Sequence, residues 1–310
     1  MIAKRPTKIL IGPSMFAAED PTPLQRLVQA GCEIVANPFK RKLTKDELLG
    51  LLDEKTAGLV AGLEPLDREV LERSKLRVIS RCGSGISNVD LVAAQELGIA
   101  VCSTPDAPTA AVAELTLGAM LSLLRMIPEM DRELHQGRWS KKIGGQLEGK
   151  TIAIIGMGRI GRHLASLLIP FNVTLLGVDP FLLEPLPSPR AISLVPLATA
   201  LGQADILSLH CSGEGCVLGP TELSAVKPGA FLLNAARGGL IDEGALIGAL
   251  EAGRVAGAWL DTFEREPYTG PLTRFPQVIL TPHVGSYTRE CRRRMELEAV
   301  ENLLSALANA

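Results

Sequence analysis

Short apolar runs alternate with amphipathic stretches along the first hundred residues. The apolar runs have the length of strands and are bounded by breaking residues, at 8–12, 33–36, 58–61, 77–80 and 100–102. Helical patterns separate them, at 24–30, 44–53, 67–73 and 90–97. Thr44 and Glu47 form a capping box, which places the start of one of these helices. Strands that alternate with helices form a parallel sheet covered on both faces, so this part of the chain predicts an α/β domain.

A second alternating region follows a proline-interrupted connector at 103–108. A long apolar helix is predicted from Thr109 to Arg125, and a further helix start lies at Pro128. Predicted strands then recur, at 151–155, before Asp179, and at 206–209, 231–234, 257–260 and 278–280. We interpret the proline-rich stretch 180–196 as a loop on the cofactor side, and a final helix at 288–308 has no strand after it. The pattern predicts a second parallel-sheet domain.

The stretch 150–179 carries the most specific motif. A buried strand ends in the glycine turn GMGRIG, a helix follows, and a second strand ends at Asp179. Gly156 allows the tight turn, Gly158 lets a pyrophosphate approach the backbone, and Gly161 lets the helix pack closely on the strand. The N–H groups at the start of the helix have no partners within the helix, so they suit a diphosphate. The motif predicts a dinucleotide site.

Asp179 indicates which dinucleotide binds. Its carboxylate can accept hydrogen bonds from the adenosine ribose hydroxyls, whereas it repels a 2′-phosphate. Pro180 and Phe181 provide no arginine that would hold such a phosphate. A glycine-rich turn alone is a weak signal, and a tight turn beside an ordinary loop aspartate is the alternative. The flanking strands, the helix and the interval to the acid favour NAD over NADP.

Composition limits the kind of protein. The chain has 310 residues, 46% hydrophobic and 21% charged, which predicts about two domains with ample core. A net charge of −2 gives no reason to expect a nucleic acid or an acidic membrane as partner. The six cysteines form no CxxC pairs, so we expect free thiols in a reducing cytoplasm and no metal site. The N-terminus lacks a signal-peptide pattern, and the longest apolar helix, interrupted by Glu114, is interpreted as a packing helix rather than a membrane span.

Ligands of parallel sheets bind beyond the carboxyl ends of the strands, so the loops there are the place to look for chemistry. His283 lies in TPHVGS, directly after a strand, and an imidazole donates and accepts protons near neutral pH. Glu266, in FEREPY after the preceding strand, can orient that imidazole and stabilise its protonated form. From spacing alone, a surface glutamate and a structural turn histidine are the favoured alternatives.

Two other loops suit a substrate carboxylate. Arg237, in NAARGGLID, follows a strand and precedes two glycines, and its planar guanidinium can hold a carboxylate at two points. The turn RCGSGISN contains Gly83, Ser84 and Gly85, whose successive N–H groups can form an anion-binding nest. The alternatives are an arginine that bonds nearby carbonyls and a turn that only joins a strand to a helix.

Three further residues end strands on the predicted cofactor side. Asp261 can bond the nicotinamide carboxamide, or else it caps a turn. His210 and Cys211 should lie near the adenosine half. We interpret Cys211 as a wall residue rather than a nucleophile, because no base is evidently paired with it.

These parts combine into one reaction. A nicotinamide cofactor transfers hydride, an arginine holds a carboxylate, and a histidine–glutamate pair moves the hydroxyl proton. Such a set oxidises a 2-hydroxy acid to a 2-oxo acid, or catalyses the reverse.

The motifs resemble those of the D-isomer-specific 2-hydroxyacid dehydrogenase family, most of all its phosphoglycerate dehydrogenase branch. The resemblance runs from about residue 63 to residue 308 and covers RCGSGISNVDL, VAELTLGAMLSLLR, GKTIAIIGMGRIG, KPGAFLLNAARGGLIDEGAL, GAWLDTFEREP and TPHVGSYT. It implies that Arg237, Glu266 and His283 are the catalytic set, with His283 as the proton donor. The expected substrate contacts are Gly83, Ser84, Gly85, Arg237 and His283. The expected NAD contacts, from the motifs and the resemblance together, are Ser84, Gly156, Gly158, Arg159, Ile160, Gly161, Asp179, His210, Cys211, Ala235, Ala236, Arg237, Asp261, His283, Gly285 and Ser286.

The resemblance also implies the domain organisation. Residues 1–102 and 288–310 would form a flavodoxin-like substrate domain, and residues 103–287 a Rossmann NAD-binding domain inserted in it. Both would be doubly wound parallel sheets. The region from Thr109 to Arg125 would supply the two-fold contact of a homodimer. Since no residues follow Ala310, feedback through an additional regulatory domain is not expected.

The loop after the third strand leaves the substrate open. Members of the phosphoglycerate branch carry an arginine there, whereas this chain has AGLE at 61–64, and Glu64 would repel a substrate phosphate. Arg138, Lys141 and Lys142, reaching from a partner subunit, would compensate for it. Reduction of hydroxypyruvate or glyoxylate is the alternative within the class. An NAD-sensing scaffold or corepressor on the same fold is the alternative from another class.

Overall fold

A computed structural model describes residues 6–182, 192–213 and 215–309. The chain divides into two compact units, of which unit 1 comprises Met1–Pro108 with Tyr287–Ala310, and unit 2 comprises Thr109–Ser286. Unit 2 is therefore inserted in the sequence of unit 1. The sequence-based boundaries, after residues 102 and 287, lie close to these. The connector 103–108 belongs to unit 1 because buried Thr104 donates its N–H to the Gly83 carbonyl and accepts the Gly83 N–H at Oγ1.

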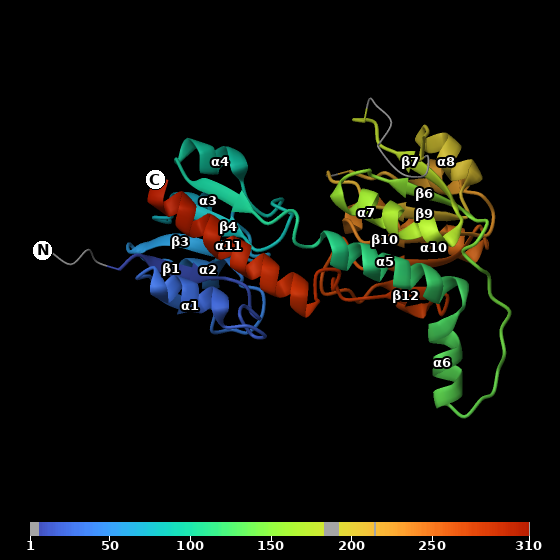
Figure 1. The fold of residues 1–310 in the computed structure, drawn as a ribbon, viewed down its shortest axis with the longest axis horizontal. Helices are drawn as coiled ribbons and strands as arrows, with labels where there is room; N and C mark the ends of the chain where they lie inside the picture. Colours follow the sequence, from blue (N-terminus) through green and yellow to red (C-terminus); the bar gives the residue numbers. More distant parts are fainter. Residues whose placement is uncertain (1–5, 183–191, 214, 310) are drawn as a thin grey trace, which may run out of the picture. The chain divides into compact units, whose positions relative to one another are not determined.

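Unit 1 is a doubly wound α/β domain, in which helices cover both faces of a parallel sheet. Its strands are β1 (Lys8–Ile11), β2 (Glu33–Ala36), β3 (Thr56–Ala61), β4 (Val78–Arg81) and β5 (Ala100–Ser103). Its helices are α1 (Thr22–Gln29), α2 (Lys45–Leu51), α3 (Arg68–Glu72), α4 (Leu91–Glu96) and α11 (Arg289–Asn309), shown in Figure 1. The described strands form one parallel sheet in the order β2-β1-β3-β4-β5. This is the flavodoxin-like order, in which the winding reverses between β1 and β3.

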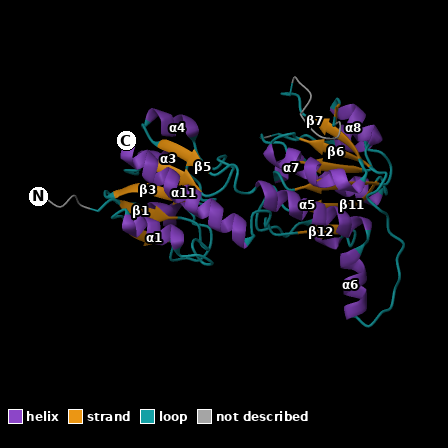
Figure 2. Ribbon diagram, in the orientation of Figure 1, coloured by secondary structure: helices purple, strands orange, loops and turns teal. Residues whose placement is uncertain are grey.

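Alternate residues of the unit 1 strands face opposite helix layers. Ile9 and Ile11 pack in a cluster with α1 and α11, whereas Leu10 packs in a cluster with α2, α3 and α4. Figure 2 shows helices flanking the strands in this way. Burial on both faces explains why these strands are continuous apolar runs in the sequence.

Unit 2 contains a longer sheet. Its strands are β6 (Thr151–Ile155), β7 (Thr174–Val178), β8 (Ser193–Leu194), β9 (Ile206–Leu209), β10 (Ala230–Asn234), β11 (Val255–Leu260) and β12 (Val278–Leu280). Its α-helices are α5 (Thr109–Leu124), α6 (Ile127–His135), α7 (Arg159–Leu168), α8 (Leu197–Gln203), α9 (Pro220–Ala225) and α10 (Glu243–Glu251). Over the described residues, the strands are parallel in the order β12-β11-β10-β9-β6-β7-β8. Numbered within the unit, β8 to β11 run 3-2-1-4-5-6, which is the Rossmann order.

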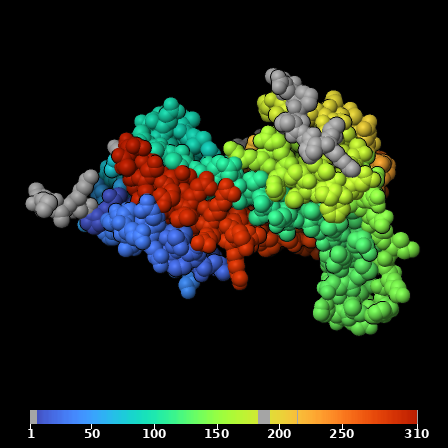
Figure 3. Space-filling view, viewed as in Figure 1, coloured from blue at the N-terminus to red at the C-terminus, as the bar shows by residue number. Residues whose placement is uncertain are grey.

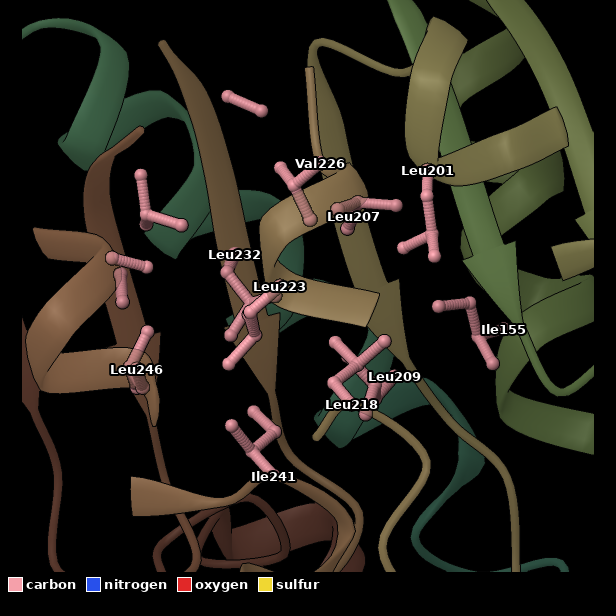
Figure 4. Packing of buried hydrophobic residues seen from close by; sticks show 14 of the residues in the cluster. Ile155, Leu201, Leu207, Leu209, Leu218, Leu223, Val226, Leu232, Ile241 and Leu246 are labelled. Carbon is pink, nitrogen blue, oxygen red and sulfur yellow. The ribbon is translucent and has the colours of Figure 1, made fainter. Parts of the chain in front are cut away.

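Two clusters of apolar side chains cover the faces of this sheet. One face packs against α5 and α7, and the other packs against α8, α9 and α10. Figure 4 shows the second cluster, in which Leu207, Leu209 and Leu232 of the strands meet Leu223 of α9 and Leu246 of α10. The sequence prediction of two doubly wound parallel-sheet domains, one inserted in the other, is confirmed.

One part of the secondary-structure prediction is wrong. Ser193 and Leu194 form β8, an edge strand paired with β7, inside the stretch that we interpreted as a loop. A two-residue strand leaves no periodic pattern from which it could be predicted. Residues 183–191 of the same stretch lie outside the described residues.

Helix α6 differs from the other helices of unit 2. None of its residues, all of which are described, is buried, and the segment after it exposes Trp139 by 80% and Ile143 by 98%. The green residues of this region stand out from the rest of unit 2 in Figure 3. Within the described residues, no single helix is long and apolar enough to cross a membrane. Only α5 and α6 taken together, bent by 65° at their junction, pass that test by length and composition.

Candidate active site

The glycine turn joins β6 to α7, and its three glycines have different surroundings. Gly156 has a φ of 97°, and a Cβ there would lie 2.3 Å from the backbone nitrogen of Cys211. A Cβ on Gly161 would lie 2.1 Å from the carbonyl oxygen of Gly156. A Cβ on Gly158 would meet none of the described atoms within 4 Å. Packing inside the protein therefore requires the first and third glycines, whereas the second faces open space that a ligand can approach.

The surroundings of this turn fit a dinucleotide. Within the described residues, α7 has no side-chain cap at its N-terminus, and it begins directly after Gly158, as a helix that binds a diphosphate would. Asp179 follows β7, and its carboxylate accepts the Met157 N–H at 3.0 Å and the Phe181 N–H at 3.0 Å. The carboxylate is thereby fixed beside the turn, where the sequence predicts a ribose. The individual contacts to NAD stay predictions.

His210 and Cys211 form one wall of this region. The His210 N–H donates to the Ile155 carbonyl at 2.7 Å, which places the end of β9 against the glycine turn. The His210 ring has Nε2 2.8 Å from the Ser208 hydroxyl, and burial lowers its pKa to about 4, so the ring is neutral near pH 7. Burial and the nearby charge of Asp179 raise the pKa of the Cys211 thiol. A protonated thiol supports the interpretation of Cys211 as a wall residue.

The structure brings His283 and Glu266 together. Nδ1 of His283 lies 3.0 Å and 3.1 Å from the two carboxylate oxygens of Glu266. The Phe263 N–H also donates to Glu266, at 3.1 Å, and orients the carboxylate. An ionised carboxylate only accepts hydrogen bonds, so this contact places the proton on Nδ1 and leaves Nε2 for another partner. Glu266 is exposed, as spacing alone favoured, and it also pairs with His283, so its catalytic role stays a prediction.

His283 is held in an uncommon backbone conformation. Its φ is 54°, in the left-handed region that few residues other than glycine adopt. Its side chain is 38% exposed, so solvent and small molecules can reach it. Strained residues that the surroundings hold in place are typical of functional sites.

Asp261 fixes the turn that carries His283. It is 1% exposed, and its carboxylate accepts the Thr281 hydroxyl at 2.6 Å, the Val284 N–H at 2.9 Å and the Gly285 N–H at 2.8 Å. Trp259 donates from Nε1 to the same Thr281 hydroxyl at 3.0 Å. The turn-capping alternative for Asp261 is thus present, and its contact to nicotinamide stays a prediction. The sequence reading missed Thr281 and Trp259, because only the fold brings them to Asp261.

The loop of Arg237 is tied to the loop of Glu266. Arg237 is exposed, and its Nη1 donates to the Ala236 carbonyl at 2.7 Å, as the structural alternative proposed. Asn234 accepts the Ala236 N–H at 3.0 Å and donates to the Arg237 carbonyl at 2.8 Å. A Cβ on Gly238 would lie 1.9 Å from the carbonyl carbon of Phe263, so the two loops pack backbone against backbone.

Arg237, Glu266 and His283 therefore follow three neighbouring strands of one sheet, β10, β11 and β12. The sequence indicated close backbone approach at the glycines after Arg237, but not the role of Asn234 or the packing of Gly238 against Phe263. An asparagine that opens a turn and bonds its own backbone is a recognisable signal for such a loop.

The turn at Gly83–Gly85 lies in unit 1. It offers an anion fewer backbone N–H donors than the sequence predicts. Gly83 donates its N–H to Thr104, so that donor is not available to a ligand. Among the described residues, the N–H groups of Ser84 and Gly85 have no such partner. The guanidinium of Arg81 lies against Gly83, since a Cβ there would be 2.6 Å from its Nη1.

The cations expected to compensate for Glu64 from a partner subunit belong to unit 2, whereas Glu64 belongs to unit 1, so this compensation stays a prediction. Glu64 itself is 1% exposed and does not face solvent. Lys142 pairs with Glu129, and Arg138 and Lys141 are exposed side chains of the segment after α6, in unit 2. Over residues 6–182, 192–213 and 215–309, no group of three or more His, Cys, Asp or Glu side chains is arranged to hold a metal ion.

Comparison with known proteins identifies the family of this chain. Residues 117–285 match the family model of the D-isomer specific 2-hydroxyacid dehydrogenase, NAD binding domain. The D-3-phosphoglycerate dehydrogenase of Methanocaldococcus jannaschii is 37% identical over 273 residues, which cover 86% of this chain and 52% of that protein. The hydroxypyruvate reductase of Thermotoga maritima is 36% identical over 275 residues, 86% of this chain and 89% of that protein. The crystal structure of the TT0316 protein from Thermus thermophilus superposes with a TM-score of 0.88 at 35% identity, over 97% of each chain.

The chain spans about half the length of the phosphoglycerate dehydrogenases that it matches. The match to the NAD-binding domain covers the glycine turn, Asp179, Arg237, Glu266 and His283. The chain belongs to the D-isomer-specific 2-hydroxyacid dehydrogenase family and contains its NAD-binding domain.

Proposed function

We propose that this chain is an NAD-dependent oxidoreductase that interconverts a D-2-hydroxy acid and its 2-oxo acid. The hydrogen-bonded pair of His283 and Glu266, 3.0 Å apart, supports this proposal most directly. The pair follows neighbouring strand ends in the unit that matches the NAD-binding domain, with the loop of Arg237 packed beside it. NAD, when bound, accepts or supplies the hydride.

Each of these side chains has a distinct role in the proposal. Nε2 of His283 takes the hydroxyl proton during oxidation and returns it to the carbonyl oxygen during reduction. Glu266 holds the imidazole by Nδ1 and stabilises its charged form. Arg237 binds the substrate carboxylate with its planar guanidinium, and the N–H groups of Ser84 and Gly85 offer further donors to an anion.

The names of the similar proteins suggest two substrate classes to test. One is a D-3-phosphoglycerate dehydrogenase and another is a hydroxypyruvate reductase. The test is the initial rate of NADH formation or consumption with 3-phosphoglycerate, D-lactate, D-glycerate, hydroxypyruvate and glyoxylate. We expect turnover of at least one pair. Absence of turnover with every D-2-hydroxy and 2-oxo acid would overturn the proposed enzymatic activity. It would favour an NAD-sensing scaffold on the same fold.

The role of His283 has its own test. We expect His283→Ala to abolish turnover and to leave NADH binding intact, because the turn is held by Asp261 rather than by the imidazole. The matched control is His135→Ala, at a histidine of α6 whose side chain is 81% exposed. Near-native kcat in His283→Ala would refute proton transfer by this residue.

We also propose a homodimer that uses the region from Thr109 to Arg125 together with α6. Much of α5 is buried inside unit 2, whereas α6 exposes Ile127 and Leu134 by 51% and 56%. Apolar side chains that project together are typical of an interface. Light scattering of the native protein and of Trp139→Glu tests this, since a monomeric native protein would contradict it.

A further inference from the structure

The sheet of unit 1 has an unusual occupant at its switch point. In the order β2-β1-β3-β4-β5, the winding reverses between β1 and β3, and crevices at such points are where open α/β sheets bind ligands. Gly12 follows β1 and Gly62 follows β3, so neither position provides a side chain. The space beyond these two strand ends is filled by the carboxyl group of Glu64.

The distances show how closely the carboxyl group fits. A Cβ on Gly12 would lie 2.1 Å from Oε1 of Glu64, and a Cβ on Gly62 would lie 2.8 Å from its Oε2. The Gly62 N–H donates to Oε1 at 2.7 Å. The side chain is 1% exposed, whereas its neighbour Leu63 is 44% exposed. The loop therefore turns its acidic residue inward and its apolar residue outward, the reverse of the usual arrangement.

Side-chain hydrogen bonds hold this arrangement in place. Asn88 donates from Nδ2 to the Glu64 carbonyl at 2.7 Å and to the Gly62 carbonyl at 3.3 Å. Asn37 donates to the Gly12 carbonyl at 2.7 Å. Loops after β1, β2, β3 and β4 thus meet around the Glu64 carboxyl group, which fixes its position.

The surroundings of Glu64 are those of an anion site. Its carboxyl group accepts backbone N–H groups, and Arg81 and Lys42 are close enough for their positive charges to lower its pKa. Burial is the largest effect and acts in the opposite direction, so the pKa of the Glu64 carboxyl group is raised on balance. Without the carboxyl group, the Gly62 N–H would face an empty crevice, with the positive charges of Arg81 and Lys42 close enough to attract an anion.

We propose that Glu64 is an internal ligand of this anion site and determines specificity by excluding substrates that carry a second anionic group, such as a phosphate. The substrate part of this inference rests on the proposed function. The site lies next to the predicted substrate turn, because Arg81 ends β4 and lies against Gly83. Glu64 excludes an anion in either protonation state, since it fills the space and occupies the Gly62 N–H when neutral and also repels the anion when charged.

The kinetic test compares D-glycerate with D-3-phosphoglycerate, which differ by the phosphate. We expect the native protein to have the higher kcat/KM with D-glycerate. Glu64→Ala should shift the ratio of the two kcat/KM values towards the phosphorylated acid by at least about tenfold, mainly through KM. Glu64→Gln keeps the shape without the charge and should shift the ratio less. Glu54→Ala, at an exposed glutamate of the same unit, is the control and should leave the ratio unchanged.

A binding test uses inorganic phosphate and needs no turnover. We expect phosphate, compared with chloride at equal ionic strength, to raise the melting temperature of Glu64→Ala and not that of the native protein or of Glu54→Ala. If Glu64→Ala does not fold, the same comparison on Glu64→Ser, whose short side chain also empties the space beside Gly12 and Gly62, decides. Higher kcat/KM for 3-phosphoglycerate in the native protein would overturn the inference, as would an unchanged ratio together with no phosphate effect. If the native protein turned over none of the acids while phosphate still raised the melting temperature of Glu64→Ala, the proposed function would be refuted and the anion site would stand.

Discussion

Substitutions at two glycines of the nucleotide turn should separate protein stability from cofactor binding. Gly158 and Gly161 are three residues apart in the same turn, and both would become alanine. Their surroundings differ, since a Cβ on Gly158 would meet none of the described atoms within 4 Å and a Cβ on Gly161 would lie 2.1 Å from the Gly156 carbonyl oxygen. The same chemical change therefore produces two different effects.

Gly161→Ala should lower stability. Real Cβ contacts are essentially never shorter than 3.0 Å, so helix α7 or the turn must move by about 1 Å to admit the methyl group. Overpacking of this kind costs about 1–3 kcal/mol, and the better helix propensity of alanine returns less than about 1 kcal/mol. We expect a net loss of about 1–2 kcal/mol, which is a measurable part of a typical domain stability of about 5–15 kcal/mol.

Gly158→Ala should leave stability almost unchanged and weaken cofactor binding. Its φ of −72° suits alanine, and the loss of a good N-cap residue is offset by the smaller entropy of the unfolded chain, each about 0.5–1 kcal/mol. The methyl group would occupy the space where the pyrophosphate is predicted to approach. A lengthened charge-assisted hydrogen bond costs about 1.5–3 kcal/mol, or about a tenfold to hundredfold rise in Kd for NADH.

Two assays on both variants test these expectations for stability and for NADH binding. Urea unfolding followed by circular dichroism gives the stability, and NADH fluorescence titration gives Kd. The reasoning is refuted if Gly158→Ala binds NADH as tightly as the native protein, because the pyrophosphate would then not approach that residue. Equal stability of Gly161→Ala and the native protein would refute the packing argument.

Two further predictions concern the cofactor region. Asp179→Ala should reduce the preference for NADH over NADPH by about tenfold or more, measured as the ratio of their Kd values, because the carboxylate beside Met157 repels a 2′-phosphate; an unchanged ratio would place ribose selection elsewhere. His210 has a pKa of about 4 in the folded protein and 6.5 when unfolded, so the unfolded chain binds the extra proton between these values and stability should fall by up to about 1.4 kcal/mol per unit as pH drops from 6.5 to 4. His210→Gln should remove that part of the slope in urea unfolding series, whereas His135→Gln should keep it.

The fold could be predicted from the sequence because its strands are buried on both faces. Ile9, Leu10 and Ile11 form a continuous apolar run, since two helix layers cover the sheet. The family motifs then supplied the insertion of one domain in the other, which periodicity alone does not show. The edge strand β8 was not predicted, because a strand of two residues is too short to show an alternating pattern. The short helices α8 and α9 were not predicted either, because they begin without the side-chain N-cap that marks the equally short α3 and α4.

The residues of the site could be predicted, but several of their partners could not. Position after a strand pointed to His283 and Arg237, and the resemblance supplied their roles. Spacing did not show that Glu266 contacts His283, because the approach of their two loops depends on how β11 and β12 are paired. Gly83 gives its N–H to Thr104, 21 residues away, and no local pattern announces such a contact. The inward turn of Glu64 likewise depends on two glycines that follow different strands.

The residues proposed for cofactor binding and those proposed for substrate selection lie in different units. The glycine turn, Asp179 and the pair of His283 and Glu266 all lie in unit 2, and each is held by main-chain groups of that unit. Glu64 and the Gly83 turn lie in unit 1, where the hydrogen bonds that fix them also come from unit 1. Because each set is fixed locally, a change at Glu64 should alter which acid is accepted and leave the Kd for NADH unchanged. A change at Gly158 should do the reverse, so the two substitutions should act additively on kcat/KM.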